Sequence, residues 1–253
     1  MATVQIRDMT SADEYFVGSC THENESAELD ACAARRLEWL RGMDQFGLRV
    51  KVATSDEERA GFLYVMPIEI CPWGPIGRDL LVIPCLFVKT THTRQGIGRA
   101  LVKAAEAEVP RQRRKGIVTV AFYHDFWFMP AGFFENLGFS VADRKGDVGM
   151  LWKISDLTVE TPRFLERNYD FKPQPGRVVV DMFYNSFCLT SNAEAQRVRE
   201  ISSEFGDAVV LNEYCADNPE SFSAYQIPRG IFVNGHEVGW GSVSYTHLRA
   251  HET

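Results

Sequence analysis

The chain has 253 residues, of which 45% are hydrophobic and 24% charged, and its formal net charge is −7 at neutral pH. This length suits two domains of roughly 100–150 residues each. The negative balance argues against non-specific binding to nucleic acid or to an anionic membrane surface. No apolar run reaches the ~18 residues of a membrane span, and the N-terminus lacks the apolar core of a signal peptide. Six scattered cysteines without a CxxC pair predict reduced thiols, a cytoplasmic location and no metal site.

The first part of the chain alternates strand and helix patterns. Period-two or continuous apolar runs predict strands at residues 3–9, 47–54, 61–70, 79–88, 116–123 and 148–154. Apolar residues at helical spacing predict helices at residues 31–43, 96–108 and 130–139. The strand at 79–88 is rich in branched and aromatic residues, so we expect it to be buried on both faces.

A second part follows the polar, proline-rich stretch at residues 171–177. Strands are expected at residues 178–184 and 208–215, and a final pair within residues 227–241 around an Asn-Gly turn. Helices are expected at residues 191–206, with Ser191 and Asn192 as caps, and at residues 218–226.

The C-terminal segment is interpreted separately. The run VSYTHLRAHET, residues 243–253, reads as an uninterrupted translation of a transposon-end sequencing adapter. We therefore assign residues 242–253 to a translated adapter and exclude them from the fold. On this interpretation the true C-terminus of the second part is missing.

Two glycines stand between the strand at 79–88 and the helix that follows. They lie in HTRQGIGRALV, where Gly96 and Gly98 are one residue apart. The first amides of a helix have no internal acceptor, and glycine would let a phosphate approach them. The same spacing also suits a close contact between helix and strand, so both interpretations stay open.

The wider pattern resembles the GNAT family of acyl-CoA N-acetyltransferases. The family signature is an apolar strand, Arg/Gln-x-x-Gly-x-Gly/Ala and a helix, followed later by an aromatic-rich helix ending in Leu-Gly-Phe, here FFENLGF. The resemblance covers residues 1–155 and implies an α/β (α+β) fold with a mixed sheet splayed between two central strands. It also implies acetyl-CoA as co-substrate, held in that splay. The cofactor-binding residues that it implies are Leu86, Phe87, Val88, Arg94, Gln95, Gly96, Ile97, Gly98, Arg99 and Phe134.

The sequence departs from the family at two positions. Thr93 replaces the first Arg/Gln of the loop, and Phe134 replaces a tyrosine that often protonates the leaving thiolate. Phenylalanine cannot donate a proton, so Tyr123, His124 or water are the substitutes. Glu69 is the candidate base, since a carboxylate near the end of that strand often acts through water in this family. A solvent-facing role for Glu69 and a capping or core role for His124 are the alternatives.

The second part places Cys188 between a strand and a helix, where the helix N-terminus favours a thiolate. Pro228 precedes a later strand, and this order resembles the thioredoxin-like fold, in which the peptide bond before that proline is usually cis. The motif is Cys-Leu-Thr-Ser, so a second thiol is absent. The layout as a whole resembles YoaP-type acetyltransferases, with the small α/β domain truncated. For Cys188 a monothiol redox site, a substrate-binding thiol and an inert helix-cap cysteine all remain open.

The sequence thus predicts a GNAT acetyltransferase domain at residues 1–155, a linker at 156–176 and a thioredoxin-like YoaP-type domain at 177–241. The predicted activity is transfer of an acetyl group from acetyl-CoA to the amine of a small molecule or peptide, by direct attack in a ternary complex. One alternative is an acyl-CoA-binding sensor without catalysis. Another is a thiol-dependent redox or binding module centred on Cys188. Nucleic acid and membranes are not expected partners, and the sequence predicts no oligomeric state.

Overall fold

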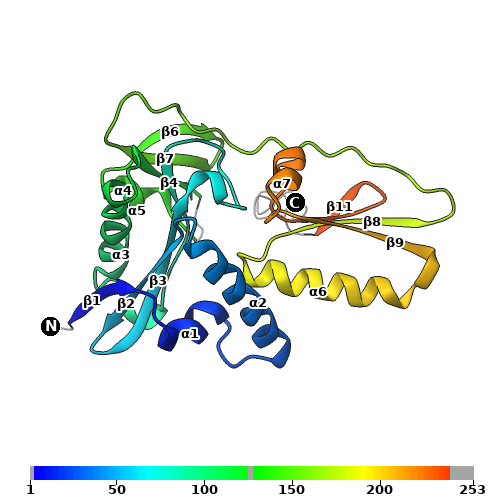
Figure 1. The fold of residues 1–253 in the computed structure, drawn as a ribbon, viewed down its shortest axis with the longest axis horizontal. Helices are drawn as coiled ribbons and strands as arrows, with labels where there is room; N and C mark the ends of the chain where they lie inside the picture. The colour runs from blue at the N-terminus through cyan, green and yellow to red at the C-terminus, as the bar shows by residue number, and fades with distance from the viewer. Residues whose placement is uncertain (1–2, 125–127, 240–253) are drawn as a thin grey trace. The chain divides into compact units, whose positions relative to one another are not determined.

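The computed structural model describes residues 3–124 and 128–239, and its chain divides into two compact units. Unit 1 comprises Met1–Glu23 and Leu40–Phe164, and unit 2 comprises Asn24–Trp39 and Leu165–Thr253. Figure 1 shows the elements of both units in chain colours. Residues 242–253, assigned above to an adapter, lie outside the described residues. Within the described ranges, no helix has both the length and the apolar character needed to cross a bilayer.

Unit 1 is built on a mixed sheet of seven strands in the order β1-β2-β3-β4-β5-β7-β6. The strands are β1 Val4–Asp8, β2 Arg49–Ser55, β3 Glu58–Pro67, β4 Leu80–Val88, β5 Gly116–Phe122, β6 Ser140–Lys145 and β7 Val148–Ile154. Only β4 and β5 pair in parallel, and every other neighbouring pair is antiparallel. The predicted mixed sheet is confirmed. The sequence missed β6, because its polar, mostly exposed side chains give an edge strand no apolar pattern.

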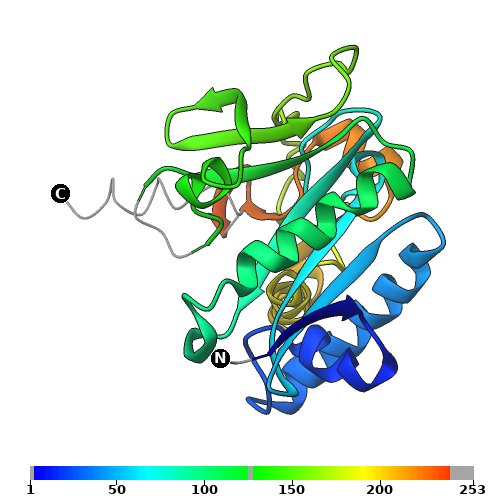
Figure 2. The ribbon, with the colours of Figure 1, turned by 90° about the vertical axis from the view of Figure 1, so that its left-hand side faces the viewer.

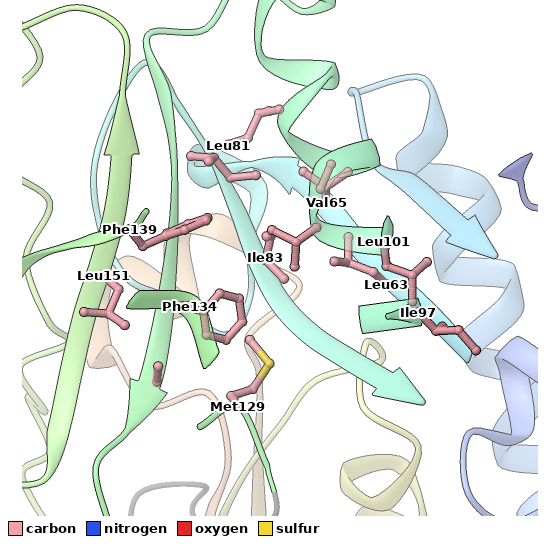
Figure 3. Close-up of a cluster of buried hydrophobic side chains, with 14 of the residues drawn as sticks. Leu63, Val65, Leu81, Ile83, Ile97, Leu101, Met129, Phe134, Phe139 and Leu151 are labelled. Carbon is pink, nitrogen blue, oxygen red and sulfur yellow. The ribbon is translucent and has the colours of Figure 1, made fainter. Parts of the chain in front are cut away.

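The helices of unit 1 are short, except for one that belongs to both units. They are α1 Glu14–Ser19, α3 Ile97–Glu106, α4 Glu108–Arg111 and α5 Ala131–Glu135, and α2 Ala27–Asp44 crosses from unit 2 into unit 1. Figure 2 shows α3 lying across the sheet, where it contacts β1 to β4. Its buried residues recur at helical spacing, and Ile97 and Leu101 meet Leu63 and Val65 of β3 in the core (Figure 3).

A buried ion pair joins this sheet to α4. Lys51 of β2 donates from Nζ to Glu108 at 2.6 Å, and the two side chains are only 5% and 6% exposed. Lys51 also contacts Asp8, and Arg111 donates to Glu108 at 2.9 Å. Burial by itself raises the pKa of Glu108, but the hydrogen bonds from Lys51 and Arg111 outweigh it and hold the pKa below its ordinary value.

Unit 2 is a smaller sheet of four strands in the order β11-β10-β8-β9. Its elements are β8 Val178–Tyr184, α6 Leu189–Glu204, β9 Val209–Cys215, α7 Pro219–Tyr225, β10 Gly230–Val233 and β11 His236–Gly239. Strands β8 and β9 are parallel and joined through α6, whereas β10 pairs antiparallel with both β8 and β11. The predicted Asn-Gly turn joins β10 to β11, with both of its residues at positive φ.

The start of α6 differs from the sequence prediction. Cys188 is the N-cap, so Ser191 and Asn192 lie inside the helix rather than capping it. Both polar side chains are buried and hold the preceding loop instead. Ser191 Oγ accepts from the Asn185 backbone at 3.1 Å, and Asn192 Nδ2 donates to the Ser186 and Cys188 carbonyls, each at 3.0 Å.

The larger, N-terminal part of α2, up to Trp39, packs inside unit 2. The Trp39 ring meets the Phe187 ring at 5.8 Å between centroids, and Arg197 of α6 pairs with Glu28 at 2.8 Å. Residues far apart in the sequence thus share one compact unit. The boundary between Phe164 and Leu165 falls inside the segment 156–176 that the sequence assigned to a linker.

Replacing Lys51 by methionine is expected to lower the free energy of unfolding by about 3–5 kcal/mol, because Glu108 would stay buried without its main partner. Urea denaturation followed by tryptophan fluorescence measures this, and a Lys51→Met/Glu108→Leu double variant should recover most of the loss. Folding lowers the pKa of Glu108. The stabilisation of the fold by the Glu108 carboxylate should therefore be complete above about pH 4.3, the pKa of an unfolded glutamate, and should be lost as the pH falls through the lower pKa of Glu108 in the folded protein. A single variant as stable as the parent would contradict this account.

Candidate functional site

Strands β4 and β5 separate half-way along β4. Their parallel pairing runs from Leu80 opposite Gly116 to Ile83 opposite Thr119 and then stops, although β4 continues to Val88. On its other side β4 pairs with β3, with Tyr64 opposite Cys85 and Met66 opposite Val82. Between these pairs β3 advances by two residues and β4 by three, so β4 carries one extra residue, a β-bulge, at Ile83–Pro84. Proline has no N–H to continue a ladder. A bulge and a proline therefore end the pairing at the same place.

The burial pattern of both strands changes where they separate. Residues 80–84 of β4 are buried and residues 85–88 are partly exposed, and Val120 and Phe122 of β5 are partly exposed as well. On the β5 side, the Phe122 amide donates to the Met129 carbonyl at 2.9 Å and Phe122 bridges to Pro130. The β4 edge beyond Ile83 has no strand partner on that side in the described part of the chain. An unpaired strand edge is therefore present, as the predicted splay requires.

The loop after β4 ends at the N-terminus of α3. Gly96 is the N-cap in the left-handed conformation, with φ +79°, and no side chain caps the helix. The backbone N–H groups of residues 94–99 find no acceptor in the described ranges. These amides sit at the positive end of the α3 dipole, which is an arrangement that binds anions.

The two glycines of the loop serve different needs. Gly96 takes a positive φ, and a Cβ placed there would meet nothing within 4 Å, so the space over the amides is open. At Gly98 a Cβ would lie 3.2 Å from the Phe133 ring and 3.9 Å from Leu86. Gly98 therefore permits close packing among α3, α5 and β4. The packing interpretation thus holds for Gly98, and the phosphate interpretation remains a prediction for Gly96.

Two cations lie beside the open amides. Arg94 and Arg99 are exposed, and neither guanidinium has an ion-pair partner in the part of the chain that the structure describes. Gln95 is exposed as well, and its side-chain amide lies 3.5 Å from both the Ser55 hydroxyl and the Thr91 carbonyl. Ile97 is buried under the helix and anchors the loop. The loop thus offers a row of amides and two available positive charges.

The cofactor-strand residues predicted from the sequence divide between two faces. Leu86 and Val88 pack against the core under α3. The Phe87 ring lies 5.4 Å from Phe62 and 6.5 Å from Phe16. All three flank the strand edge that has no partner beyond the bulge.

Phe134 lies in the core rather than at an accessible surface. It is 0% exposed and meets the Phe133 and Phe139 rings at 5.0 and 5.5 Å between centroids. Its neighbour Phe133 is partly exposed and reaches Gly98. Phe133 was not among the predicted site residues, because two adjacent phenylalanines in a sequence do not reveal which of them faces inward.

Tyr123 and His124 follow the end of β5 but point to different surroundings. The Tyr123 hydroxyl donates to Glu135 at 2.7 Å, and the Arg144 guanidinium lies 3.9 Å from the centre of its ring. Partial burial, together with Glu135, raises the pKa of Tyr123. The His124 ring stacks on Phe122 at 5.4 Å between centroids, at the end of β5 where the strands have separated.

Glu69 lies at the other end of β4. It accepts the Asp79 amide at 2.9 Å and pairs with Arg114 at 2.9 Å, so it fixes the turn that leads into the strand. Five residues separate Asp79 from Pro84, which corresponds to about 17 Å along a strand. The structure does not bring Glu69 to the separated ends of β4 and β5, and it favours the solvent-facing alternative.

The candidate thiol in unit 2 belongs to a braced loop. Cys188 Sγ lies 3.2 Å from Thr190 Oγ1, which accepts from Arg229 at 2.8 Å, and Arg229 pairs with Glu194. Asn185 connects this loop to the proline, since its Oδ1 accepts the Cys188 amide at 2.9 Å and its Nδ2 donates to the Pro228 carbonyl at 2.8 Å. The bond between Ile227 and Pro228 is trans, contrary to the expected cis form.

The remaining cysteines are not partners for Cys188 in any disulfide. All six cysteines are free, and burial raises the pKa of Cys215 to about 11. Within the described residues, no group of three or more His, Cys, Asp or Glu side chains is placed to hold a metal ion.

Glu69→Ala is expected to lower the free energy of unfolding by about 1–2 kcal/mol, because the Asp79 amide and Arg114 both lose their acceptor. Glu69→Gln keeps an acceptor for Asp79 and should cost less than about 1 kcal/mol, since the ion pair is partly exposed. Urea titrations of both variants test this. Equal losses would mean that the ion pair, rather than the Asp79 hydrogen bond, holds the turn.

Comparison with known proteins agrees with this geometry for unit 1. Residues 47–141, which include the β4 bulge, the glycine loop and α5, match a family model described as an acetyltransferase (GNAT) domain. A search of curated proteins found no match.

Several solved acetyltransferases are similar in structure. The GNAT family N-acetyltransferase YhbS from Escherichia coli, solved with CoA, is 20% identical over 61% of this chain and 82% of its own, with a TM-score of 0.44. A ribosomal-protein-alanine N-acetyltransferase from Brucella melitensis is 18% identical over 59% and 99%, with a TM-score of 0.45. A second GNAT family acetyltransferase from Brucella melitensis, in complex with acetyl-CoA, is 15% identical over 64% and 94%, with a TM-score of 0.43. We take the assignment from the domain model alone: the chain carries an acetyltransferase domain of the GNAT family.

Proposed function

We propose that unit 1 binds acetyl-CoA and transfers its acetyl group to the amine of a small molecule or peptide. The observation that carries the proposal is the row of unsatisfied amides at residues 94–99, directly after a strand whose edge has lost its partner. A diphosphate satisfies such amides, and an extended amide-containing arm can pair with a strand edge. Coenzyme A contains both parts in one molecule.

The cofactor would lie along β4 with its diphosphate on the loop. Arg94 and Arg99 would pair with phosphate oxygens by charge-assisted hydrogen bonds. Gly96 leaves that approach open, and Ile97 and Gly98 hold the first turn of α3 in place. The pantetheine arm would then run beside the backbone of Leu86, Phe87 and Val88.

The transfer needs one bond to form and one to break. The neutral amine attacks the thioester carbonyl, the carbon–sulfur bond breaks, and the leaving thiolate takes up a proton. Phe134 cannot supply this proton, and the Tyr123 hydroxyl already donates its proton in a hydrogen bond to Glu135. We assign the proton exchange to His124 at the end of β5, assisted by water. Since Glu69 lies at the far end of β4, we do not assign it a role in this step.

A binding module without turnover is the second candidate for unit 1. It is favoured by the phenylalanine at position 134, where the family often has a proton-donating tyrosine. Such a sensor would bind acetyl-CoA but release no free thiol with any amine. Thiol release across a panel of small and peptide amines distinguishes the two candidates.

We further propose that unit 2 is a thioredoxin-like domain of the YoaP type, with a functional thiol at Cys188. Supporting this are the strand order, the single parallel pair joined through α6, and the placement of Cys188 at the start of that helix. Asn185 bonds to both the Cys188 amide and the Pro228 carbonyl. The trans peptide bond before Pro228 counts against a close likeness. Six free cysteines support a reducing, cytoplasmic location for the protein.

Calorimetric titration of acetyl-CoA into the full chain tests the cofactor site. Gly96→Glu should weaken binding by at least about 100-fold, because it places a carboxylate where the phosphates approach. Gly96→Asn is the matched control for backbone strain, since asparagine tolerates a positive φ, and it should bind within about tenfold of the parent. Unchanged affinity in Gly96→Glu would overturn the assignment of the loop.

Alkylation of Cys188 by iodoacetamide tests the second proposal. Replacing Arg229 by methionine should slow the reaction at neutral pH by about 3- to 10-fold, because Thr190 loses the donor that holds its hydroxyl beside the Cys188 sulfur. A Glu194→Gln variant keeps Arg229 and serves as the control. Identical rates in all three proteins would leave Cys188 as an ordinary helix-cap cysteine.

A further inference from the structure

A buried floor closes the separated strands at the point where β4 and β5 rejoin. We call the acyl floor the set formed by Ile83, Thr119, Met129 and Phe134. Ile83, Thr119 and Phe134 are 0% exposed and Met129 is 3% exposed. The Thr119 hydroxyl donates to the Ile83 carbonyl at 2.8 Å across the last paired residues. Figure 3 shows Phe134 and Met129 next to Ile83, in the same cluster as Leu151.

Met129 is held in place by its backbone. Its φ is +48°, a conformation that side chains with a Cβ rarely adopt. The hydrogen bond from the Phe122 amide to its carbonyl and the bridge from Phe122 to Pro130 fix this conformation. Strain of this kind persists only where the surroundings impose it, and it gathers at functional sites. The Met129 side chain lies in the core, as part of the floor.

The geometry limits how far a ligand can extend along β4. A molecule anchored on the amides of residues 94–99 follows the free edge from Val88 towards Pro84, and there the strands pair again. Its tip must therefore stop at the acyl floor. Close-packed interiors do not accept extra methylene groups without displacing side chains.

We propose that Met129 and Phe134 set the acyl-chain limit of this enzyme, so that an acetyl donor fits and a butyryl or longer donor does not. This inference rests on the proposed function and adds the residues that determine donor specificity. Met129 is the easier of the two to displace, because it is unbranched and flexible. Shortening it should therefore extend the donor range first.

Binding of a donor series to the full chain tests the proposal without any acceptor. The ligands are CoA, acetyl-CoA and butyryl-CoA, titrated calorimetrically into the parent, Met129→Ala and Phe134→Leu. The control is Leu101→Ala, which removes a fully buried side chain from α3 in the same core but away from the floor. The affinity for CoA itself, which has no acyl group, reports whether each variant retains the cofactor site.

In the parent, butyryl-CoA should bind about tenfold more weakly than acetyl-CoA. Met129→Ala should reduce this ratio to about threefold or less, with Phe134→Leu in the same direction, while CoA affinity stays unchanged. Leu101→Ala should keep the ratio of the parent. Equal binding of acetyl-CoA and butyryl-CoA to the parent, or an unchanged ratio in both floor variants, would overturn the acyl limit and leave the proposed function intact. Failure of CoA itself to bind the parent would overturn both.

Discussion

The separation of β4 from β5 is the constraint on which the rest of unit 1 depends. A sheet normally satisfies every backbone group through its neighbours, so ending a ladder in the middle of a domain has a cost. Here three local features reduce the number of unpaired backbone groups. The bulge on β4 shifts the pairing by one residue, Pro84 has no N–H to pair, and the Thr119 hydroxyl donates to the Ile83 carbonyl. What remains unpaired is the β4 edge that a ligand can use.

The glycine loop and α5 are placed by this separation. Because Gly98 has no side chain, the Phe133 ring approaches the first turn of α3, and α5 can fill the space beside β5. Phe134 then turns into the core and Phe133 towards the loop. The absence of a Cβ at Gly98 therefore lets α5 pack against the first turn of α3.

Unit 2 combines an apolar core, which includes Phe183, Ile227 and Phe232, with buried polar side chains around the loop before α6. Asn185 and Asn192 satisfy the backbone of the loop before α6 and fix it to Pro228 and to the helix. Such a network is stable only when each member finds a partner, and it gives Cys188 a defined position. Residues of α2 also contribute, since Trp39 packs on Phe187 within the same unit.

The sequence by itself determined the local features. Apolar periodicity predicted most strands and helices, the Gly96 and Gly98 stretch predicted a loop between a strand and a helix, and the Asn-Gly turn predicted the last hairpin. These follow from interactions within a few residues. It could not show that Glu69 and Val88 lie at opposite ends of one sheet, that Phe134 faces inward, that Ser191 and Asn192 are not caps, or that part of α2 belongs to unit 2. Only the tertiary structure decided those points, because each depends on which distant segment covers a given face, and local sequence does not encode that.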